Sequence, residues 1–411
     1  MQDDDQEKLA EIMQMDEVYF NAVLNISAVE GQSSEGLEFA RELPRTNPCR
    51  SIVQVPGSQE RVDLQVFPER WFLRRGEAPL NNRGWVFQER TLSPRIVQFA
   101  KDQAFWECRS LLASEVLPQG LPCATALRSN KGVGIGRDSS DILQVKSRWY
   151  ALVEEYSRTL VTFPDDHLLA VSAVAKRFCH AMLLDPSDYV AGMWKDDLPL
   201  SMLWGQEPLP GRAGPEPTSI GREMKHAPSW SWASVFAPIV MLDFDCPLVA
   251  STEVLGVELA RKSPNFFDGT ESCRIRLRGP LAKLCRRLRD GEAWVQIGHD
   301  AEFQEFDEFE FQKGSSIIIW WDTARKMASN EFFSLHIGSE PSADGRIERG
   351  VILCRTMDRG IFSRVGSFMI PLGSESAALD VVQIFTSCSH LLSEDDFLEH
   401  RLSGKCVIDV I

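Results

Sequence analysis

The stretch from Asn82 to Cys108 constrains the fold more than any other part of this 411-residue chain. Charged and amide side chains alternate there with large apolar ones, first in Arg83-Gly84-Trp85-Val86-Phe87-Gln88-Glu89-Arg90 and again in Phe105-Trp106-Glu107-Cys108. The pattern predicts a helix over residues 83–89 and a strand over 95–99. Charges this close to tryptophans are rarely buried unless they are paired, so the stretch demands a specific packed environment.

Two interpretations of this cluster are open. In the functional one, Arg83 anchors a phosphate-bearing small molecule, and Glu89 or Glu107 acts as an acid, a base or a ribose partner. In the structural one, Arg83 pairs with Glu89 or Glu107 in a dry network beside Trp85 and Trp106. We favour the structural interpretation, because no cofactor is indicated locally. In both cases we expect an acid within hydrogen-bond reach of Arg83, and we expect both tryptophans to be largely buried.

Composition narrows the class of protein. The net charge of −15 argues against general binding to nucleic acid or to an anionic membrane surface. The longest apolar runs are too short to span a bilayer, and the acidic first residues do not resemble a signal peptide. The ten cysteines lack zinc-ligand spacing, so we expect no metal and a reduced, cytoplasmic protein.

The order of patterns predicts three regions. Residues 1–120 form an α/β domain, with a helix over about 4–22 and a strand within 21–29. Residues 121–236 are mainly helical, with helices over 147–159 and 166–184 after a Gly-rich linker. Residues 237–411 form a β-rich domain, which makes the whole chain α+β. Its expected strands are Val254–Leu259, Cys273–Leu277, Ala293–Ile297, Ser316–Trp321, Phe332–Ile337, Gly350–Arg355 and Phe362–Met369.

The alternating stretch resembles the last block of the fungal heterokaryon incompatibility (HET) domain. That block has an Arg-Gly/Ala-Trp, a Gln-Glu-Arg, then a strand and a Trp-Glu-Cys. The matching residues here are Arg83, Gly84, Trp85, Gln88, Glu89, Arg90, Trp106, Glu107 and Cys108. The first residues, with Met15, Val18-Tyr19 and Ala22, resemble the family's middle block. The family's opening block is absent, so we expect a HET domain that is truncated at its N-terminus.

The resemblance implies a partial sheet of the TIR or flavodoxin type. It also implies a role in non-self recognition and programmed cell death signalling, with other proteins or further copies of the chain as partners. Some TIR domains cleave NAD+ with a glutamate at the start of a helix, which makes Glu7 and Glu11 candidate catalytic residues and NAD+ a candidate substrate. No cofactor is otherwise evident, and two solvated acids in a helix are the favoured interpretation. A second alternative is a degenerate, non-catalytic paralogue that acts as an interaction module.

Three further motifs have structural explanations. Gly132, Gly134 and Gly136 lack the spacing of a nucleotide-binding loop and suit a flexible linker. His167 follows Asp165 and Asp166, one of which we expect to cap a helix rather than to serve a catalytic base. The run 229–234, Ser-Trp-Ser-Trp-Ala-Ser, predicts a strand whose two tryptophans close a domain.

Overall fold

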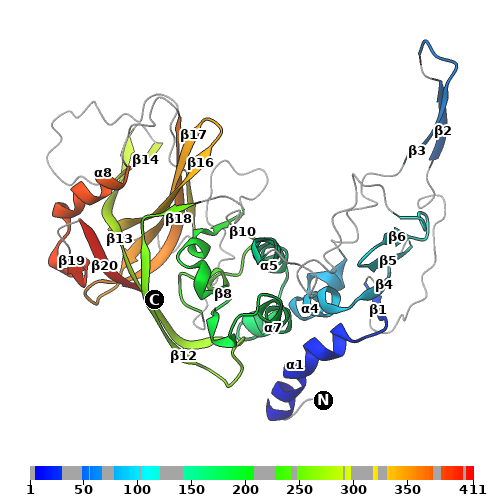
Figure 1. Cartoon of the computed structure of the whole chain (residues 1–411), viewed down its shortest axis with the longest axis horizontal. Coiled ribbons are helices and arrows are strands. Elements are labelled where there is room, and N and C mark those ends of the chain that lie inside the picture. The colour runs from blue at the N-terminus through cyan, green and yellow to red at the C-terminus, as the bar shows by residue number, and fades with distance from the viewer. Residues whose placement is uncertain are drawn as a thin grey trace. The chain divides into compact units, whose positions relative to one another are not determined.

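The chain packs as two compact units in a computed structural model (Figure 1). Unit 1 comprises residues 1–141 and 159–183, and unit 2 comprises 142–158 and 184–411. Helices and several sheets occur together, which confirms the α+β class. None of the described helices is long and apolar enough to cross a membrane. The structure describes residues 5–29, 49–54, 56–66, 78–100, 103–120, 142–207, 227–241, 248–289, 292–297, 318–322, 331–373, 381–400 and 404–411.

The expected middle region, 121–236, is shared between the two units. Residues 159–183 belong to unit 1, whereas the helix α5 (Ile142–Ser157) and residues from 184 onward belong to unit 2. The Gly-rich run 132–136 lies outside the described residues. The division into three regions therefore stays a prediction, and the structure shows a chain that leaves unit 1, enters unit 2, returns and leaves again.

Unit 1 combines helices with one mixed sheet. The predicted helix at 83–89 is α4 and the predicted strand at 95–99 is β4, so both are confirmed. The single helix expected over 166–184 is wrong, because Ala170 ends one helix and Val171 precedes the next. The elements are α1 (Asp5–Phe20), β1 (Asn25–Ala28), β2 (Cys49–Gln54), β3 (Arg61–Val66), η1 (Pro79–Asn82), α4 (Gly84–Leu92), β4 (Arg95–Phe99), β5 (Ala104–Cys108), β6 (Leu112–Ser114), α6 (Asp166–Leu169) and α7 (Ser172–Ala181).

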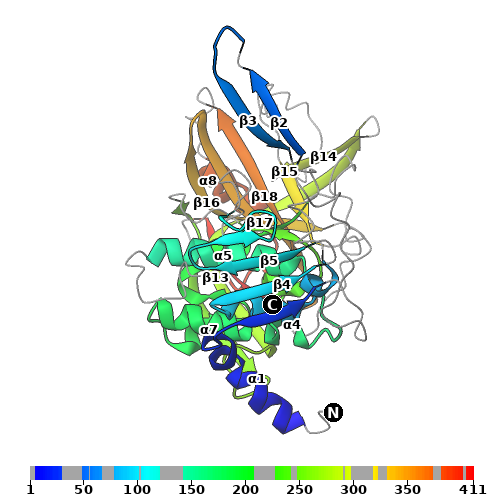
Figure 2. The ribbon, with the colours of Figure 1, turned by 90° about the vertical axis from the view of Figure 1, so that its right-hand side faces the viewer.

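The sheet of unit 1 has the strand order β1-β4-β5-β6 (Figure 2). Strands β1 and β4 are parallel, with Asn25 opposite Ile96, and the other two pairings are antiparallel. A flavodoxin-type sheet is mainly parallel, and this sheet shares only one parallel pair with it. The expected TIR-like or flavodoxin-like sheet therefore stays a prediction. Alternate side chains of β4 and β5 are buried, namely Ile96 and Gln98, and Phe105 and Glu107.

Strands β2 and β3 form a hairpin whose two faces differ. Val53 lies opposite Val62, and Leu64 shares their face, whereas Asp63 lies on the other face opposite Ile52. All five of these side chains are exposed. The hairpin therefore presents an apolar face to solvent.

Unit 2 is built around a large sheet of strands. The seven predicted β runs all fall on observed strands, with Ser316 and Ile317 of one run outside the described residues. Its remaining elements are η2 (Pro186–Asp188), β7 (Tyr189–Val190), β8 (Met193–Trp194), η3 (Lys195–Asp197), η4 (Leu200–Leu203), β9 (Gly205–Gln206), η5 (Trp232–Ser234), β10 (Ile239–Val240), β11 (Val249–Ala250), β12 (Glu253–Arg261), β13 (Thr270–Arg289), β14 (Glu292–Ile297), β15 (Ile318–Trp321), β16 (Phe332–Ser342), β17 (Gly345–Arg355), β18 (Ile361–Gly373), α8 (Val381–Ser387), η8 (Cys388–Leu391), η9 (Glu394–Asp396), β19 (Glu399–His400) and β20 (Lys405–Val410).

Five strands of this sheet form a closed ring. The order β16-β17-β18-β20-β13 returns to its start, because β13 pairs with β20 through residues 275–280 and with β16 through residues 281–284. The side chains of Leu281, Leu335 and Val351 are fully buried. The length of β13, 20 residues, is what allows one strand to pair on successive stretches with different partners.

An aromatic cluster forms a second core in unit 2. Trp149 on α5 contacts Tyr189 and Trp194 edge-on, with ring centroids 6.1 and 5.5 Å apart. Trp230 and Trp232 are also buried. The strand predicted for the Ser-Trp-Ser-Trp run is wrong, since the chain turns there into η5 and both tryptophans point into packed surroundings.

Candidate functional site

The HET-like motif begins at a backbone junction in unit 1. The N–H of Gly84 donates to the carbonyl of Leu160 at 2.8 Å, and the N–H of Leu160 donates to the carbonyl of Asn82 at 2.6 Å. These bonds hold the first turn of α4 against the segment that leads into α6. The start of the motif is therefore fixed by residues about 75 positions later in the chain.

Trp85 connects α4 to α6. Its indole Nε1 donates to Oδ2 of Asp166 at 3.3 Å, and Asp166 is buried. Asp165 occupies the N-cap position of α6 without a side-chain capping bond. Asp165 thus holds the position expected for Asp165 or Asp166, but the expected side-chain cap is not found, and the described bond of the Asp166 carboxylate is to the tryptophan of the motif. Trp85 itself is partly buried rather than fully enclosed.

Gln88 joins three helices. Its side chain is 0% exposed; Nε2 donates to Sδ of Met15 on α1 at 3.1 Å, and Oε1 accepts from the N–H of Ala173 at 3.3 Å. Ala173 is the second residue of α7, whose first N–H groups have no partner within the helix. Gln88 satisfies one of those N–H groups, as a capping side chain would.

Glu89 lies in a partly buried polar group with Tyr19 and Arg83. Burial raises the pKa of the Glu89 carboxyl, while a hydrogen bond from Tyr19 and the charge of Arg83 oppose that rise. Burial, the charge of Glu89 and the same hydrogen bond raise the pKa of Tyr19 to about 12. Arg83 is exposed, and no acid among the described residues lies within ion-pair distance of it. The expected hydrogen bond between Arg83 and an acid is therefore not found there, and the interaction with Glu89 is through charge.

A buried ion pair completes this helical junction. Asp16 on α1 is 2% exposed, and its carboxylate lies 2.8 Å from Lys176 Nζ and 3.2 Å from Arg177 Nη2 on α7. The guanidinium of Arg177 also lies over the ring of Phe20, 4.1 Å from its centroid. Asp16 is not evident from the sequence, because its partners are some 160 residues away and no local pattern indicates them.

The second half of the motif lies on β5. Glu107 is buried and lies opposite Ile96, while Trp106 and Cys108 on the other face are partly exposed. Arg90 lies in the last turn of α4, where a positive charge suits the helix dipole. The structure therefore brings Gln88 and Glu89 together with α1 and α7, whereas Glu107 belongs to the sheet.

The buried face of the sheet holds a polar side chain, Gln98, that no sequence motif indicates. Gln98 is 1% exposed, and neither atom of its side-chain amide has a hydrogen-bond partner among the described residues. It lies between Ser27 and Phe105, diagonally across from Glu107, a relation that places side chains about 7–8 Å apart. In the sequence, its only indication is a glutamine that shares one face of the predicted strand with Ile96. The face offers a neutral donor and acceptor beside a carboxyl group.

The other predicted residues lie apart from this region. Glu11 is exposed on α1, and Glu7 lies on the same helix. His167 is buried in α6, and burial lowers its pKa to about 4, so it is neutral at pH 7. Among the described residues, no group of His, Cys, Asp and Glu side chains could hold a metal ion.

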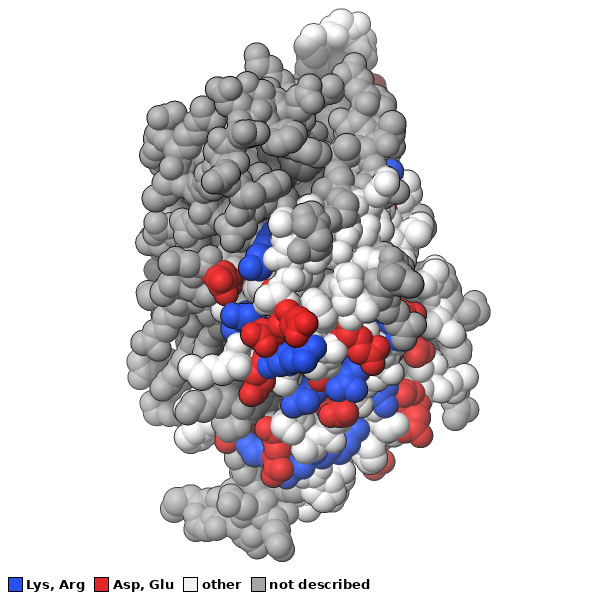
Figure 3. Space-filling view, turned by 90° about the vertical axis from the view of Figure 1, so that its left-hand side faces the viewer, with Lys and Arg blue, Asp and Glu red and all other residues white. Residues whose placement is uncertain are grey.

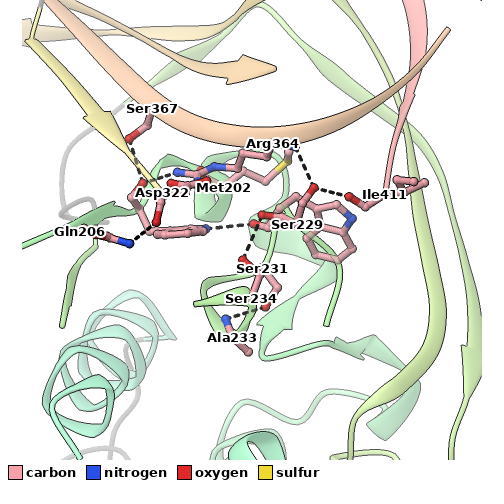
Figure 4. A network of polar contacts seen from close by, with 12 residues as sticks. Met202, Gln206, Ser229, Ser231, Ala233, Ser234, Asp322, Arg364, Ser367 and Ile411 are labelled. Carbon is pink, nitrogen blue, oxygen red and sulfur yellow. Dashed lines mark hydrogen bonds and ion pairs between the residues drawn. The ribbon is translucent and has the colours of Figure 1, made fainter. Parts of the chain in front are cut away.

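A separate polar network lies at the centre of unit 2 (Figure 4). Arg364 on β18 is fully buried; Nη1 lies 2.5 Å from Oδ2 of Asp322, Nε donates to the carbonyl of Met202 at 3.0 Å, and Nη2 donates to that of Trp204. The guanidinium lies 3.7 Å from the centroid of the Trp204 ring. Burial lowers the pKa of Arg364, and Asp322 counteracts it.

The same network fixes the last residue of the chain. Oγ of Ser229 accepts from the N–H of Arg364 at 2.8 Å and donates to the carbonyl of Ile411. Oγ of Ser231 donates to the carbonyl of Ala191 at 2.5 Å. These bonds join four distant segments of unit 2. The serines of the Ser-Trp-Ser-Trp run are therefore structural residues that hold these segments together.

Comparison with known families identifies the class of the N-terminal region. Residues 1–89 match the family described as heterokaryon incompatibility protein (HET). The chain thus carries a HET domain match that includes α1 and most of the helical motif residues, and the resemblance is confirmed. The last four motif residues, Arg90, Trp106, Glu107 and Cys108, lie beyond the matched residues. No curated protein and no solved structure matches the chain.

Proposed function

We propose that the chain acts in fungal heterokaryon incompatibility, as a cytoplasmic HET-domain protein that signals programmed cell death after non-self recognition. The family match over residues 1–89 carries the proposal. The motif residues support it, because Trp85, Gln88 and Glu89 contact α6, α7 and α1 and so hold the matched region in one packed unit. The signal would pass to other proteins or to further copies of the chain.

The charge distribution supports protein partners over nucleic acid. Figure 3 shows one face of the molecule on which acidic and basic side chains alternate. In unit 2, Arg276 pairs with Asp409 at 2.8 Å, and Arg278 pairs with Glu253. A surface that binds nucleic acid needs a continuous positive potential. Here the positive charges of these arginines are neutralised by the carboxylates beside them.

The experiment expresses the full chain from an inducible promoter in a filamentous fungus. Cell death is measured as dye uptake and loss of colony growth. We expect the wild-type chain to kill. We expect Glu89→Gln to reduce killing, because it removes the charge that Tyr19 and Arg83 stabilise. Glu17→Gln, at an exposed position of α1, is the matched control and should kill like the wild type. Soluble wild-type chain without any killing would contradict the proposal.

Three further measurements distinguish the alternatives. NAD+ is assayed in the same cells before the dye enters; a fall that precedes dye uptake favours the NAD+-cleaving enzyme, for which Glu7→Gln and Glu11→Gln are the next variants. The melting temperature of purified Glu89→Gln separates a signalling role from a structural one. A variant that no longer kills but melts like the wild type assigns Glu89 to signalling. Binding of another copy without killing would favour the interaction module.

A further inference from the structure

A serine, a histidine and a glutamate form a continuous hydrogen-bonded chain in unit 2, outside the HET match. Ser251 follows β11, His336 lies on β16 and Glu348 lies on β17. Oγ of Ser251 is 2.6 Å from Nδ1 of His336, and Nε2 of the same ring is 2.8 Å from Oε2 of Glu348. The histidine and the glutamate are buried, at 0% and 1% exposure, while Ser251 is partly exposed. Of these three residues, Ser251 is therefore the one that a reagent in solution can reach.

The surroundings hold Glu348 in its charged form. Burial raises the pKa of its carboxyl, but hydrogen bonds from His336 and Ser339 and the charge of Arg346 counteract the rise and bring the pKa below its usual range. Nε of Arg346 lies 2.7 Å from Oε1 of Glu348. A carboxylate can only accept hydrogen bonds, so Nε2 of the imidazole carries its proton toward Glu348. In a neutral ring, Nδ1 is then the free acceptor that faces the serine hydroxyl.

The backbone fixes the serine in front of the ring. The N–H of Ser251 donates to the carbonyl of Ile337 at 2.8 Å, and Nζ of Lys405 donates to the carbonyl of Ser251 at 2.8 Å. The ring of Phe385 lies 5.5 Å from the imidazole, centroid to centroid. Among the described residues the hydroxyl has one other acceptor, the carbonyl of His336 at 2.9 Å, so a small rotation about the Cβ–Oγ bond directs its proton to either.

We infer that Ser251 is an activated nucleophile for acyl groups, with His336 as its base and Glu348 as the residue that orients the base. A nucleophile within hydrogen-bond reach of a base, and a base oriented by a third group, is the arrangement that activates serine. Nδ1 faces the serine here and Nε2 faces the acid; in a neutral imidazole either nitrogen can be the acceptor while the other carries the proton.

The reaction is an acyl transfer from an ester to the serine and then to water. The Oγ–C bond forms as the proton of Ser251 moves to Nδ1 of His336, and the alkoxide of the ester leaves with that proton as the alcohol. Water then attacks the acyl-serine, gives its proton to Nδ1, and the proton returns to Oγ as the acid is released. One ester and one water give one acid and one alcohol, without oxidation or reduction.

The test treats the purified full chain with a fluorophosphonate and maps the labelled peptide by mass spectrometry. Oγ displaces fluoride from phosphorus, and the proton passes to His336. We expect Ser251 to be labelled about 10²-fold or more faster than Ser339, in line with what a positioned base contributes. Ser251→Ala should lose the label. Ser263→Ala should keep it, because that hydroxyl donates to Asp268 and does not contact the imidazole. A folded wild-type chain that is not labelled at Ser251 overturns the inference.

A second comparison avoids variants of the buried histidine, which can unfold. Ser251→Cys and Ser339→Cys place a thiol at two positions of the same unit, and only the first faces His336. We expect iodoacetamide to alkylate Cys at position 251 at least tenfold faster at neutral pH, where a base promotes the thiolate. Equal rates would overturn the proposed role of His336 as the base.

Discussion

Gln88 shows at the scale of one residue what the motif does. Its amide bonds Met15 and Ala173, which belong to helices on opposite sides of the motif in sequence. We predict that Gln88→Leu lowers the free energy of unfolding by about 1–3 kcal/mol, because it leaves a buried N–H of α7 unsatisfied. Urea denaturation measures the change. Gln144→Leu, at an exposed position of α5, should change it by less than about 0.5 kcal/mol.

The cysteines give a second prediction at this scale. Burial raises the pKa of Cys108, but hydrogen bonds from Ser110, Trp106 and the backbone bring it below its usual value. Burial raises the pKa of Cys273 and of Cys406 to about 12. Because the thiolate is the reactive form, Cys108 should be alkylated first as the pH is raised from 6 to 9. Peptide mapping after short exposure to iodoacetamide checks the order, and earlier alkylation of Cys273 in the folded chain would contradict it.

At the scale of an element, α6 makes stability depend on pH. Burial lowers the pKa of His167 from 6.5 to about 4, so the unfolded chain binds a proton between these values that the folded chain does not. This contribution to stability is full above pH 6.5 and is lost as the pH falls toward 4, by up to about 3 kcal/mol. His167→Gln should flatten that slope in urea denaturation at pH 4–7. Gln144→Leu, at an exposed position of α5, should leave the slope unchanged, because it removes no titratable group.

The strand β18 depends on one buried ion pair. Asp322→Asn leaves the guanidinium of Arg364 without its charged partner, and we predict a loss of about 3–5 kcal/mol. Arg158→Gln breaks the pair with Glu207, whose side chains are 45% and 41% exposed, and should cost no more than about 1 kcal/mol. Thermal melting compares the two variants. Equal effects would mean that burial does not decide the strength of these pairs.

The sequence predicted elements well where their pattern is local. The helix at 83–89, the strand at 95–99 and the strands of unit 2 follow from apolar spacing alone. The Ser-Trp-Ser-Trp run has the same alternation as a strand, but Ser229 and Ser231 bond to Ile411 and Ala191, and these distant partners turn the chain. The basic residues after Leu284 interrupt the apolar pattern, so the last five residues of the 20-residue strand β13 are not predicted from the sequence.

The candidate site was less predictable for the same reason. The motif residues of the HET domain were identified from their resemblance, but their partners were not. Asp16 meets Lys176 and Arg177, and Gln88 meets Ala173, across separations that no window of sequence covers. Gln98 is a polar residue in an otherwise apolar strand, which alone does not predict its burial. Whether it is buried depends on the elements that pack on the sheet.

For the whole molecule, the units do not follow the order of the chain. Unit 1 needs α6 and α7, which are encoded after residue 158. We predict that residues 1–120 alone aggregate, because Asp16 and Gln88 lose their partners and the apolar face of α7 no longer covers its neighbours. The full chain, which supplies α6 and α7, is the control and should not aggregate. Light scattering and thermal melting of the fragment and of the full chain check this, and a cooperatively melting monomer of 1–120 would contradict it.

The ring of strands in unit 2 has a consequence for synthesis on the ribosome. β13 ends at Arg289, and its partner β20 begins at Lys405, about 115 residues later. At translation rates of about 5–20 residues per second, roughly 6–25 s pass between the synthesis of β13 and that of β20, and during this time the edge of β13 that pairs with β20 is unpaired. Unit 2 therefore completes its hydrogen bonding only when the last strand has emerged, so that in the cell the nascent chain should depend on chaperones until that moment.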